Sequence, residues 1–579
     1  MLKSQKTLLL GAALGAGFFG MAIKGGVPSF ASDQGIDSLS GNYLAGIHAR
    51  KLRDHDAAAE FFARALRDDA DNKDIIERAF QLEIGRGNFA RGEELAQQVV
   101  ANDPRHRMAR VVLALRDMKA ERYADAREHL THAAYTPLGQ LTSALLSAWC
   151  WAGDGRMDMA LKSLKNLDKT DSFAIYNSFN AALIADFLNK PAAAKRHYKR
   201  IYNDASSSLR VVQTYGNYLE RQGDGETAKK VYNRYLKDQV SHPLVESTVE
   251  RMDAGGKASP IIRSMRDGVA EALFSLSSAL ADQSGIDFAL LYAQAALDMR
   301  PGLPVALTLL GDIYEDMNKF DSAIVAYEKV PVGSALRPNA EIRIAVNNDR
   351  LGNEKKAEEG LKALIERDPS VSDPLVTLAN IYRSHDKFSE AEEYYSRAIK
   401  LAGDIKPHHW TLFYFRGICF ERTKRWPKAE ADFRKALELN NDQPLVLNYL
   451  GYSWVDQGMN LEEAIEMIQK AVELRPNDGY IVDSLGWAHY RLKNYPEAVK
   501  YLERAVELKP DDPVINDHLG DAYWRSGRKL EAGFQWNHAL DNKPEEEEIE
   551  KIKKKVQSGL PDETPDAAAG QEPDPEKKS

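Results

Sequence analysis

The sequence predicts an all-α solenoid, a superhelical stack of helix-turn-helix units, and three observations support this fold class. A pattern of small and large apolar residues recurs every 34 residues and is clearest between residues 450 and 544. Glycine and alanine occupy the positions where the two helices of a unit would cross closely. Proline follows most of the clear units, because it cannot continue a helix. One helix pair cannot bury its own apolar face, whereas a stack of pairs shares a continuous core.

The C-terminal units define the pattern most clearly. Each contains Leu-Gly, then Ala, a large apolar residue, Ala and Pro at fixed offsets. In two successive units these residues are Leu485, Gly486, Ala498, Leu502, Ala505 and Pro510, and then Leu519, Gly520, Ala532, Trp536, Ala539 and Pro544. The pattern resembles the tetratricopeptide repeat, in which the first helix of each pair lines a concave groove. The resemblance implies a surface for holding other proteins.

The same spacing continues upstream and gives about twelve units in all. The N-terminal half is more degenerate but keeps the phase. In chain order, the upstream units are marked by Gly46 and Ala58, Pro104, Ala114 and Ala126, Ala160 and Leu164, Ala182 and Ala194, Gly216 and Ala228, Leu276 and Ala289, Gly311 and Ala323, Ala345 and Ala357, Ala379 and Ala391, Gly417 and Ala429, and Gly451 and Ala464.

Composition divides the chain into two stacks with distinct ends. The run Asp-Ala-Gly-Gly-Lys-Ala-Ser-Pro at residues 253–260 indicates a flexible joint. A charged segment after the last unit predicts a solvated capping helix, and the Pro-, Asp- and Glu-rich end predicts disorder. The predicted order is a signal peptide at 1–31, a degenerate stack at 32–240, the joint at 241–260, a second stack at 261–544, the capping helix at 545–558 and the acidic tail at 559–579.

The first 31 residues are typical of an export signal and predict a periplasmic protein. Lys3 and Lys6 precede an apolar run at residues 8–23, and Ser29-Phe30-Ala31 offers small residues at both cleavage-determining positions. The apolar run is shorter than the roughly 20 residues that span a bilayer. Cleavage is therefore the favoured outcome, and the alternative is that the segment is retained as an N-terminal membrane anchor.

Composition and motifs argue against several functions. The net charge of −9 is unlike that of a nucleic-acid-binding surface. Gly255-Gly256-Lys257-Ala258 lacks the spacing of a phosphate-binding loop, and we find no convincing catalytic, cofactor or metal site. Cys150 and Cys419 occupy a position that is alanine in the strongest units, so we expect both to be small buried residues. The sequence therefore predicts a protein that is not an enzyme.

The resemblance implies which side chains face the groove. They lie two residues before, two after and five after the leucine of each Leu-Gly pair. Aromatic rings beside Asn and Asp suit an extended peptide, although some rings could instead pack the neighbouring helix. Aspartates would also repel a peptide carboxylate. The candidate binding residues are Asn380, Arg383, Tyr414, Asn448, Tyr452, Asp483, Trp487, Tyr490, Asp517, Asp521 and Trp524.

The C-terminal units carry a more specific resemblance in the runs Leu450-Gly451-Tyr452-Ser453-Trp454 and Asp483-Ser484-Leu485-Gly486-Trp487. They resemble long envelope tetratricopeptide proteins of Gram-negative bacteria, which include the lipoprotein adaptor of the carboxyl-terminal processing protease. The resemblance implies a periplasmic scaffold that presents peptidoglycan hydrolases to such a protease. That adaptor is anchored through a lipidated cysteine, and this chain has no cysteine near the signal. The alternative is a structural component of an exopolysaccharide or outer-membrane protein assembly or secretion complex.

Overall fold

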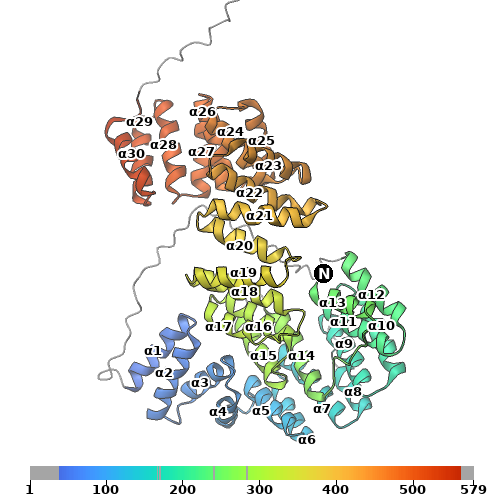
Figure 1. The fold of residues 1–579 in the computed structure, drawn as a ribbon. Helices are drawn as coiled ribbons and strands as arrows, with labels where there is room; N and C mark the ends of the chain where they lie inside the picture. The colour runs from blue at the N-terminus through green and yellow to red at the C-terminus, as the bar shows by residue number, and fades with distance from the viewer. Residues whose placement is uncertain (1–37, 166, 168–170, 239–241, 282–284, 562–579) are drawn as a thin grey trace, which may run out of the picture. The chain divides into compact units, whose positions relative to one another are not determined.

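The computed structural model describes residues 38–561 except 166, 168–170, 239–241 and 282–284 (Figure 1). Every regular element in these ranges is helical, which confirms the predicted all-α class. The chain divides into two compact units, Met1–Arg367 and Asp368–Ser579. The predicted signal peptide and most of the predicted tail lie outside the described residues. No helix in the described ranges combines the length and apolarity that spanning a bilayer demands.

The helices of the first unit follow one another in pairs, apart from α13. They are α1 (Leu39–Lys51), α2 (His55–Asp68), α3 (Lys73–Gly85), α4 (Phe89–Asn102), α5 (Arg107–Lys119), α6 (Tyr123–Ala133), α7 (Pro137–Gly153), α8 (Met157–Lys165), α9 (Asp171–Phe187), α10 (Pro191–Asp204), α11 (Leu209–Arg221), α12 (Gly225–Asp238), α13 (Pro243–Asp253), α14 (Met265–Leu280), α15 (Ile286–Met299), α16 (Pro304–Asp316), α17 (Phe320–Glu328), α18 (Arg337–Arg350) and α19 (Glu354–Arg367).

The second unit contains five pairs and a final single helix. They are α20 (Asp373–Ser384), α21 (Phe388–Ala402), α22 (Trp410–Arg422), α23 (Trp426–Leu439), α24 (Pro444–Gln457), α25 (Leu461–Leu474), α26 (Gly479–Arg491), α27 (Tyr495–Leu508), α28 (Pro513–Arg525), α29 (Lys529–Asp541) and α30 (Glu546–Ser558), with a 3-10 turn at Pro407–His409. With nine pairs in the first unit, the described residues hold fourteen pairs, one for each of the fourteen sets of repeat residues named from the sequence, against the expected total of about twelve units. The degenerate units fold as helix pairs too.

The turn between the two helices of a pair has a fixed backbone conformation. In six successive pairs one residue at this turn has a positive φ, and these residues are Arg53, Gly87, Glu121, Gly155, Asn189 and Gly223. Their numbers differ by 34 at every step, so the N-terminal half keeps the period without a single insertion. Glycine is the residue that adopts this conformation at least cost, and half of the six positions hold another residue. The turn geometry is therefore more regular than the sequence pattern indicates.

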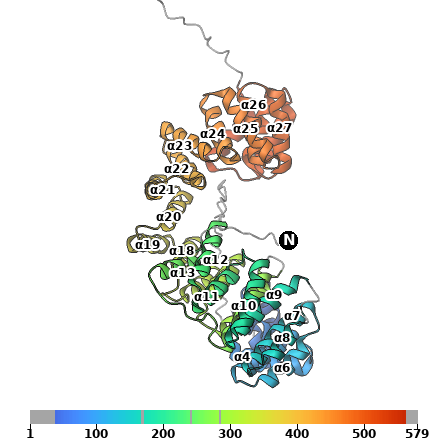
Figure 2. The same ribbon diagram turned by 90° about the vertical axis from the view of Figure 1, so that its right-hand side faces the viewer.

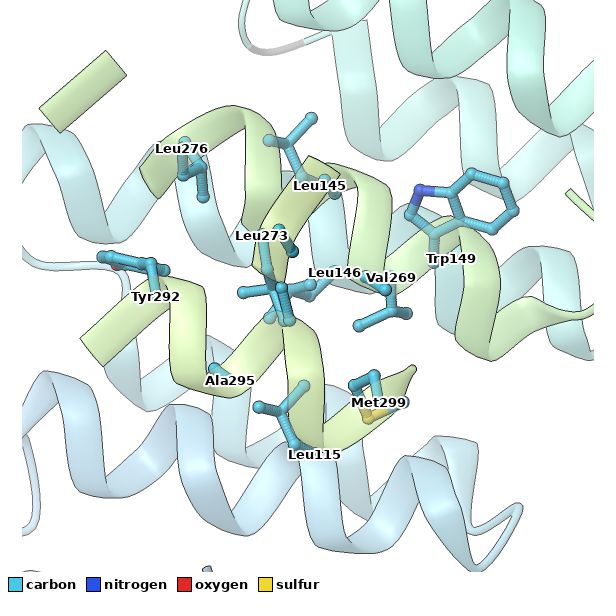
Figure 3. Close-up of a cluster of buried hydrophobic side chains, with 14 of the residues drawn as sticks. Leu115, Leu145, Leu146, Trp149, Val269, Leu273, Leu276, Tyr292, Ala295 and Met299 are labelled. Atoms are coloured by element: carbon cyan, nitrogen blue, oxygen red, sulfur yellow. The ribbon is translucent and has the colours of Figure 1, made fainter. Parts of the chain in front are cut away.

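The first unit folds back on itself. Helices α14 and α15 lie against α3, α5, α7 and α9, which are first helices of the N-terminal pairs. Figure 3 shows the resulting core, to which four helices contribute buried side chains: Trp149 from α7, Leu115 from α5, and, from the packed pair, Val269 and Leu273 of α14 with Met299 of α15. The side of the N-terminal pairs formed by α3, α5, α7 and α9 is consequently covered by α14 and α15. The predicted joint at residues 241–260 lies inside this unit, and α13 forms part of it.

Polar contacts hold α14 and α15 in this position. Arg210 on α11 donates from Nε and Nη2 to the two carboxylate oxygens of Glu271 on α14, at 2.8 and 2.6 Å. Gln294 on α15 donates from Nε2 to the backbone carbonyl of Gly85 at the end of α3, at 3.1 Å. Glu271 and Gln294 are both buried. Because burying a polar group without a hydrogen-bond partner is costly, these bonds fix the position of α14 and α15.

The second unit is a simpler stack. Figures 1 and 2 show its helices following one another in order from α20, and each helix packs on those that neighbour it in the chain. Phe433, Trp454, Ile468 and Trp536 are among its fully buried side chains. The charged helix expected at residues 545–558 coincides with α30, which packs on α29. Cys419 in this unit and Cys150 in the first are buried and free, as expected.

Candidate protein-binding face

The candidate residues all lie on the first helices of the second unit, α20, α22, α24, α26 and α28. We call the surface that these helices form the first-helix face. Three candidates, Tyr414, Asp483 and Asp521, are buried, and the others are half-buried. The positions that the repeat resemblance implies therefore share one side of the stack, but they do not share one environment.

Tyr414 belongs to the core of the second unit and not to its surface, which corrects the expectation for this residue. Only 1% of it is exposed, and its ring lies 5.1 Å from that of Phe415 and 6.1 Å from that of Tyr449. Burial raises the pKa of its phenol to about 12. The ring packs between successive first helices because the next helix along the stack covers it.

Asp483 is also engaged inside the stack, because its carboxylate contacts a histidine of the next first helix. His518, on the next first helix α28, places Nδ1 2.9 Å from Asp483 Oδ1. The ring of Trp487 stacks on His518 at 4.1 Å and on Tyr490 at 4.7 Å between centroids. Burial disfavours the charged imidazole, but Asp483, Asp517 and Asp521 outweigh it and raise the pKa of His518. The sequence prediction missed His518, whose only signal was its place directly before the Leu-Gly pair.

Asp517 and Asp521 are neutralised by the capping helix. Lys555 on α30 lies 2.7 Å from a carboxylate oxygen of Asp517 and 2.8 Å from one of Asp521. Burial opposes the charge of Lys555, yet the two aspartates hold the pKa of Lys555 above its usual value. Asp521 also accepts a bond from Trp536 Nε1 at 2.9 Å. With an internal cation beside each aspartate, the expected repulsion of a peptide carboxylate at this end is not supported.

Trp524 is covered at the same end of the stack. A Cβ atom added to Gly559 would lie 2.0 Å from the Trp524 ring, so the chain that follows α30 runs directly against this side chain. The ring of Trp524 also lies 5.5 Å from that of Trp536. Trp524 therefore packs the end of the solenoid in this structure.

The other end of the face is held by a small polar network. Tyr395 on α21 donates its hydroxyl to Asn380 Oδ1 at 2.6 Å, and Arg383 donates from Nε to the same hydroxyl at 3.3 Å. The guanidinium of Arg383 lies 4.4 Å from the centre of the Phe415 ring. These contacts hold Asn380 against the second helix of its own pair and Arg383 against both that helix and the next pair.

The middle of the face, on α24 and α26, keeps the most binding capacity. Trp487, Tyr490 and Tyr452 remain half-buried after all their internal contacts. Burial, with a contribution from the nearby Asp483, raises the pKa of Tyr452 to about 12, so its phenol is a neutral donor. Asn448 has a buried Oδ1 with no hydrogen-bond partner in the described structure. Rings beside an unused acceptor can pack a peptide side chain and accept a peptide N–H.

Two other features bear on function. A hollow of about 450 Å³ lies away from the first-helix face, between α27, α28 and α29. Its lining includes Val506, Asn516 and Phe534. Phe534 is 66% exposed, and the sequence prediction did not single it out. Within the described ranges, no group of three or more His, Cys, Asp or Glu side chains is arranged to hold a metal ion.

Comparison with known families supports the repeat assignment. Models described as tetratricopeptide repeat match residues 305–330, 376–444 and 482–512. The chain therefore contains tetratricopeptide repeats, and proteins built from these repeats act as protein-binding scaffolds and are typically not catalysts. The matches lie between α16 and α27, and one of them, at residues 482–512, falls in the part of the chain where the sequence pattern is clearest.

Individual proteins show the same likeness over part of their length. A TPR repeat-containing protein of Pseudomonas aeruginosa is 28% identical over 182 residues, which cover 31% of this chain and 30% of that protein. The mitochondrial import receptor subunit TOM70 of Mus musculus is 25% identical over 174 residues, 30% of this chain and 28% of that protein. The chain thus matches less than a third of either relative. The crystal structure of the APC/C hetero-tetramer Cut9-Hcn1 covers 90% of this chain and 96% of its own, with 14% identity and a TM-score of 0.38.

Proposed function

We propose that this chain is a non-enzymatic scaffold that binds proteins on the first-helix face of its second unit. The observation that carries the proposal is the stack of rings formed by Tyr490, Trp487 and His518, with Tyr452 on the preceding first helix. Trp487 and Tyr490 stay half-buried after their internal contacts, so part of each ring can still meet a ligand. Partly exposed aromatic side chains contribute most of the binding free energy at many protein interfaces.

We infer further that the scaffold works in the bacterial cell envelope and presents peptidoglycan hydrolases to a carboxyl-terminal processing protease. Support comes from the resemblance of residues 450–492 to envelope adaptors and from the export-type features of residues 1–31. A bacterial relative with the same repeats is consistent with this setting. The alternative role in exopolysaccharide or outer-membrane protein assembly would use the same face.

The test is capture of partners in intact Gram-negative cells. An aromatic photo-crosslinking amino acid at position 487, which keeps a ring there, should trap a protease and peptidoglycan hydrolases, whereas the same group at the exposed Lys500 on α27 should not. Capture of a polysaccharide synthase or outer-membrane assembly proteins would instead support the alternative. Equal capture from positions 487 and 500 would overturn the assignment of the face.

A paired variant separates binding from packing. Trp487→Ala with Tyr490→Ala should weaken capture by about tenfold or more, because anchor rings often contribute more than 1 kcal/mol each. The melting temperature should change little. Unchanged capture together with a clearly lower melting temperature would show that both rings only hold the stack together.

A further inference from the structure

The outer side of the first unit carries a register of basic residues on three successive second helices, α8, α10 and α12. Figure 1 shows these helices along the outer edge of the N-terminal pairs, on the opposite side from α14 and α15. The buried alanines Ala160, Ala194 and Ala228 occupy equivalent positions 34 residues apart. They provide a common reference for the exposed faces of the three helices.

Counting from each alanine gives the same charge at the same place. The residue two positions after each alanine is basic on all three helices: Lys162, Arg196 and Lys230. The next helical turn adds four more basic residues, Lys165, Lys199, Arg200 and Arg234. All seven side chains are exposed. We call these seven residues the basic stripe. At the equivalent position on the preceding second helix, α6, the residue is Glu128, so the stripe begins at α8.

The stripe is largely without counter-charges. Arg234 has an exposed intrahelical partner in Asp238 at 3.5 Å. Within the described ranges, no carboxylate lies within ion-pair distance of Lys162, Lys165, Arg196, Lys199, Arg200 or Lys230. His197 lies between these basic residues, and burial together with the charges of Arg196 and Arg200 lowers its pKa. No acidic side chain raises the pKa of His197, which agrees with the lack of counter-charges around the stripe. This positive surface stands out in a chain whose net charge is −9.

The surroundings restrict the kind of ligand. Among the described residues of α8, α10 and α12, no large apolar or aromatic side chain is exposed, so the stripe offers nothing to stack on a base or insert into a bilayer. Recognition must therefore depend on charge. The opposite, first-helix side of these pairs is occupied by α14 and α15, which leaves the second-helix side as the broad surface open to a partner.

We propose that the basic stripe docks an extended, acidic segment of a partner protein, with Asp and Glu carboxylates pairing across α8, α10 and α12. This proposal rests on the proposed scaffold function, because it takes the ligand to be a protein. It adds a second contact surface, on a different unit from the aromatic first-helix face. The attraction should be long-ranged and sensitive to salt, since exposed charges are screened over about 8 Å at physiological ionic strength.

The direct test uses the purified full chain and a fluorescent peptide of alternating Glu and Ser, with a Gln-Ser peptide as the uncharged match. The acidic peptide should bind saturably at low salt and weaken steadily as salt is added. Arg196→Glu with Lys199→Glu and Arg200→Glu should reduce its affinity by about tenfold or more. If this reversal disturbs folding, as judged by circular dichroism, the same three residues changed to Gln provide the test.

A control variant makes the same change in net charge elsewhere in the first unit. Lys355→Glu with Lys356→Glu and Lys362→Glu on α19 should leave binding within about twofold. Equal losses in both variants would overturn the proposal, because the effect would then come from net charge alone. Binding to phosphatidylglycerol vesicles that the acidic peptide cannot displace would also overturn it in favour of a membrane surface. Failure here with successful capture at Trp487 would leave the first-helix face as the protein-binding surface.

Discussion

Gly268 on α14 lies directly against the ring of Trp149 on α7, and a Cβ atom on this glycine would sit 2.2 Å from two ring atoms. Trp149 is fully buried, and its Nε1 donates to Asn180 Oδ1 at 2.9 Å, so the ring has little freedom to move aside. These two residues are 119 positions apart in the chain. Their contact is one place where α14 packs closely on the N-terminal pairs.

Gly268→Ala should therefore destabilise the first unit by roughly 1–3 kcal/mol, because the added methyl group overpacks a rigid site. Gly360→Ala on α19 is the matched control, since its new Cβ would meet only Ala345, at 3.9 Å. That control should be stabilised by about 0.5–1 kcal/mol, as expected for alanine in an exposed helix. Urea unfolding followed by circular dichroism measures both. Identical midpoints would show that α14 does not pack on α7 as described.

The buried ion pair between Arg210 and Glu271 should be a second point of weakness. Arg210→Met leaves the carboxylate of Glu271, which is 1% exposed, without its partner and should cost about 3–5 kcal/mol. The double variant Arg210→Met with Glu271→Met should recover most of that loss, because no buried charge remains. A double-mutant cycle from denaturant unfolding gives the coupling. Additive losses would mean that the two side chains do not interact.

The pair of His518 and Asp483 makes a pH-dependent contribution to stability. The pKa of His518 is raised in the folded chain above its unfolded value of about 6.5. The folded chain therefore binds this proton more tightly than the unfolded chain does. The stabilisation is thus fully present below about pH 6.5 and is lost as the pH rises through the folded pKa. His518→Gln should remove this dependence, whereas substitution of the exposed His408 should not. An NMR titration of His518 that gives a pKa below 6.5 would contradict this prediction.

Cys150 and Cys419 should be chemically silent in the folded protein. Burial raises the pKa of each thiol to about 12, and the thiolate is the reactive form. Iodoacetamide at mild alkaline pH should label neither residue until denaturant is added, when mass spectrometry should find two adducts. A cysteine introduced at the exposed Ser370 should react at once and confirm that the reagent is active. Labelling of the native chain would show that the helix pairs around the labelled cysteine unfold locally and expose its thiol.

The repeat architecture could be predicted from the sequence because its determinants are local. Gly486 faces Leu502 and Gly520 faces Trp536 within one helix pair, so a 34-residue window contains both partners of each contact. The same reasoning correctly places Cys150 and Cys419 among the small buried residues. It also places the candidate binding residues on one side of the stack, since their positions follow from the repeat phase.

The tertiary structure alone decided how the helices of the first unit close on themselves and which face residues stay available. The contacts of Gly268 with Trp149 and of Glu271 with Arg210 join distant parts of the chain, and no periodic pattern records such a meeting. On the first-helix face, repeat phase gives Asp483 and Trp487 similar roles. Their environments differ because His518 reaches back from the next helix to Asp483 and stacks on Trp487. The contact partners that a neighbouring helix pair supplies depend on how the pairs pack on one another, so they are known only from the tertiary structure.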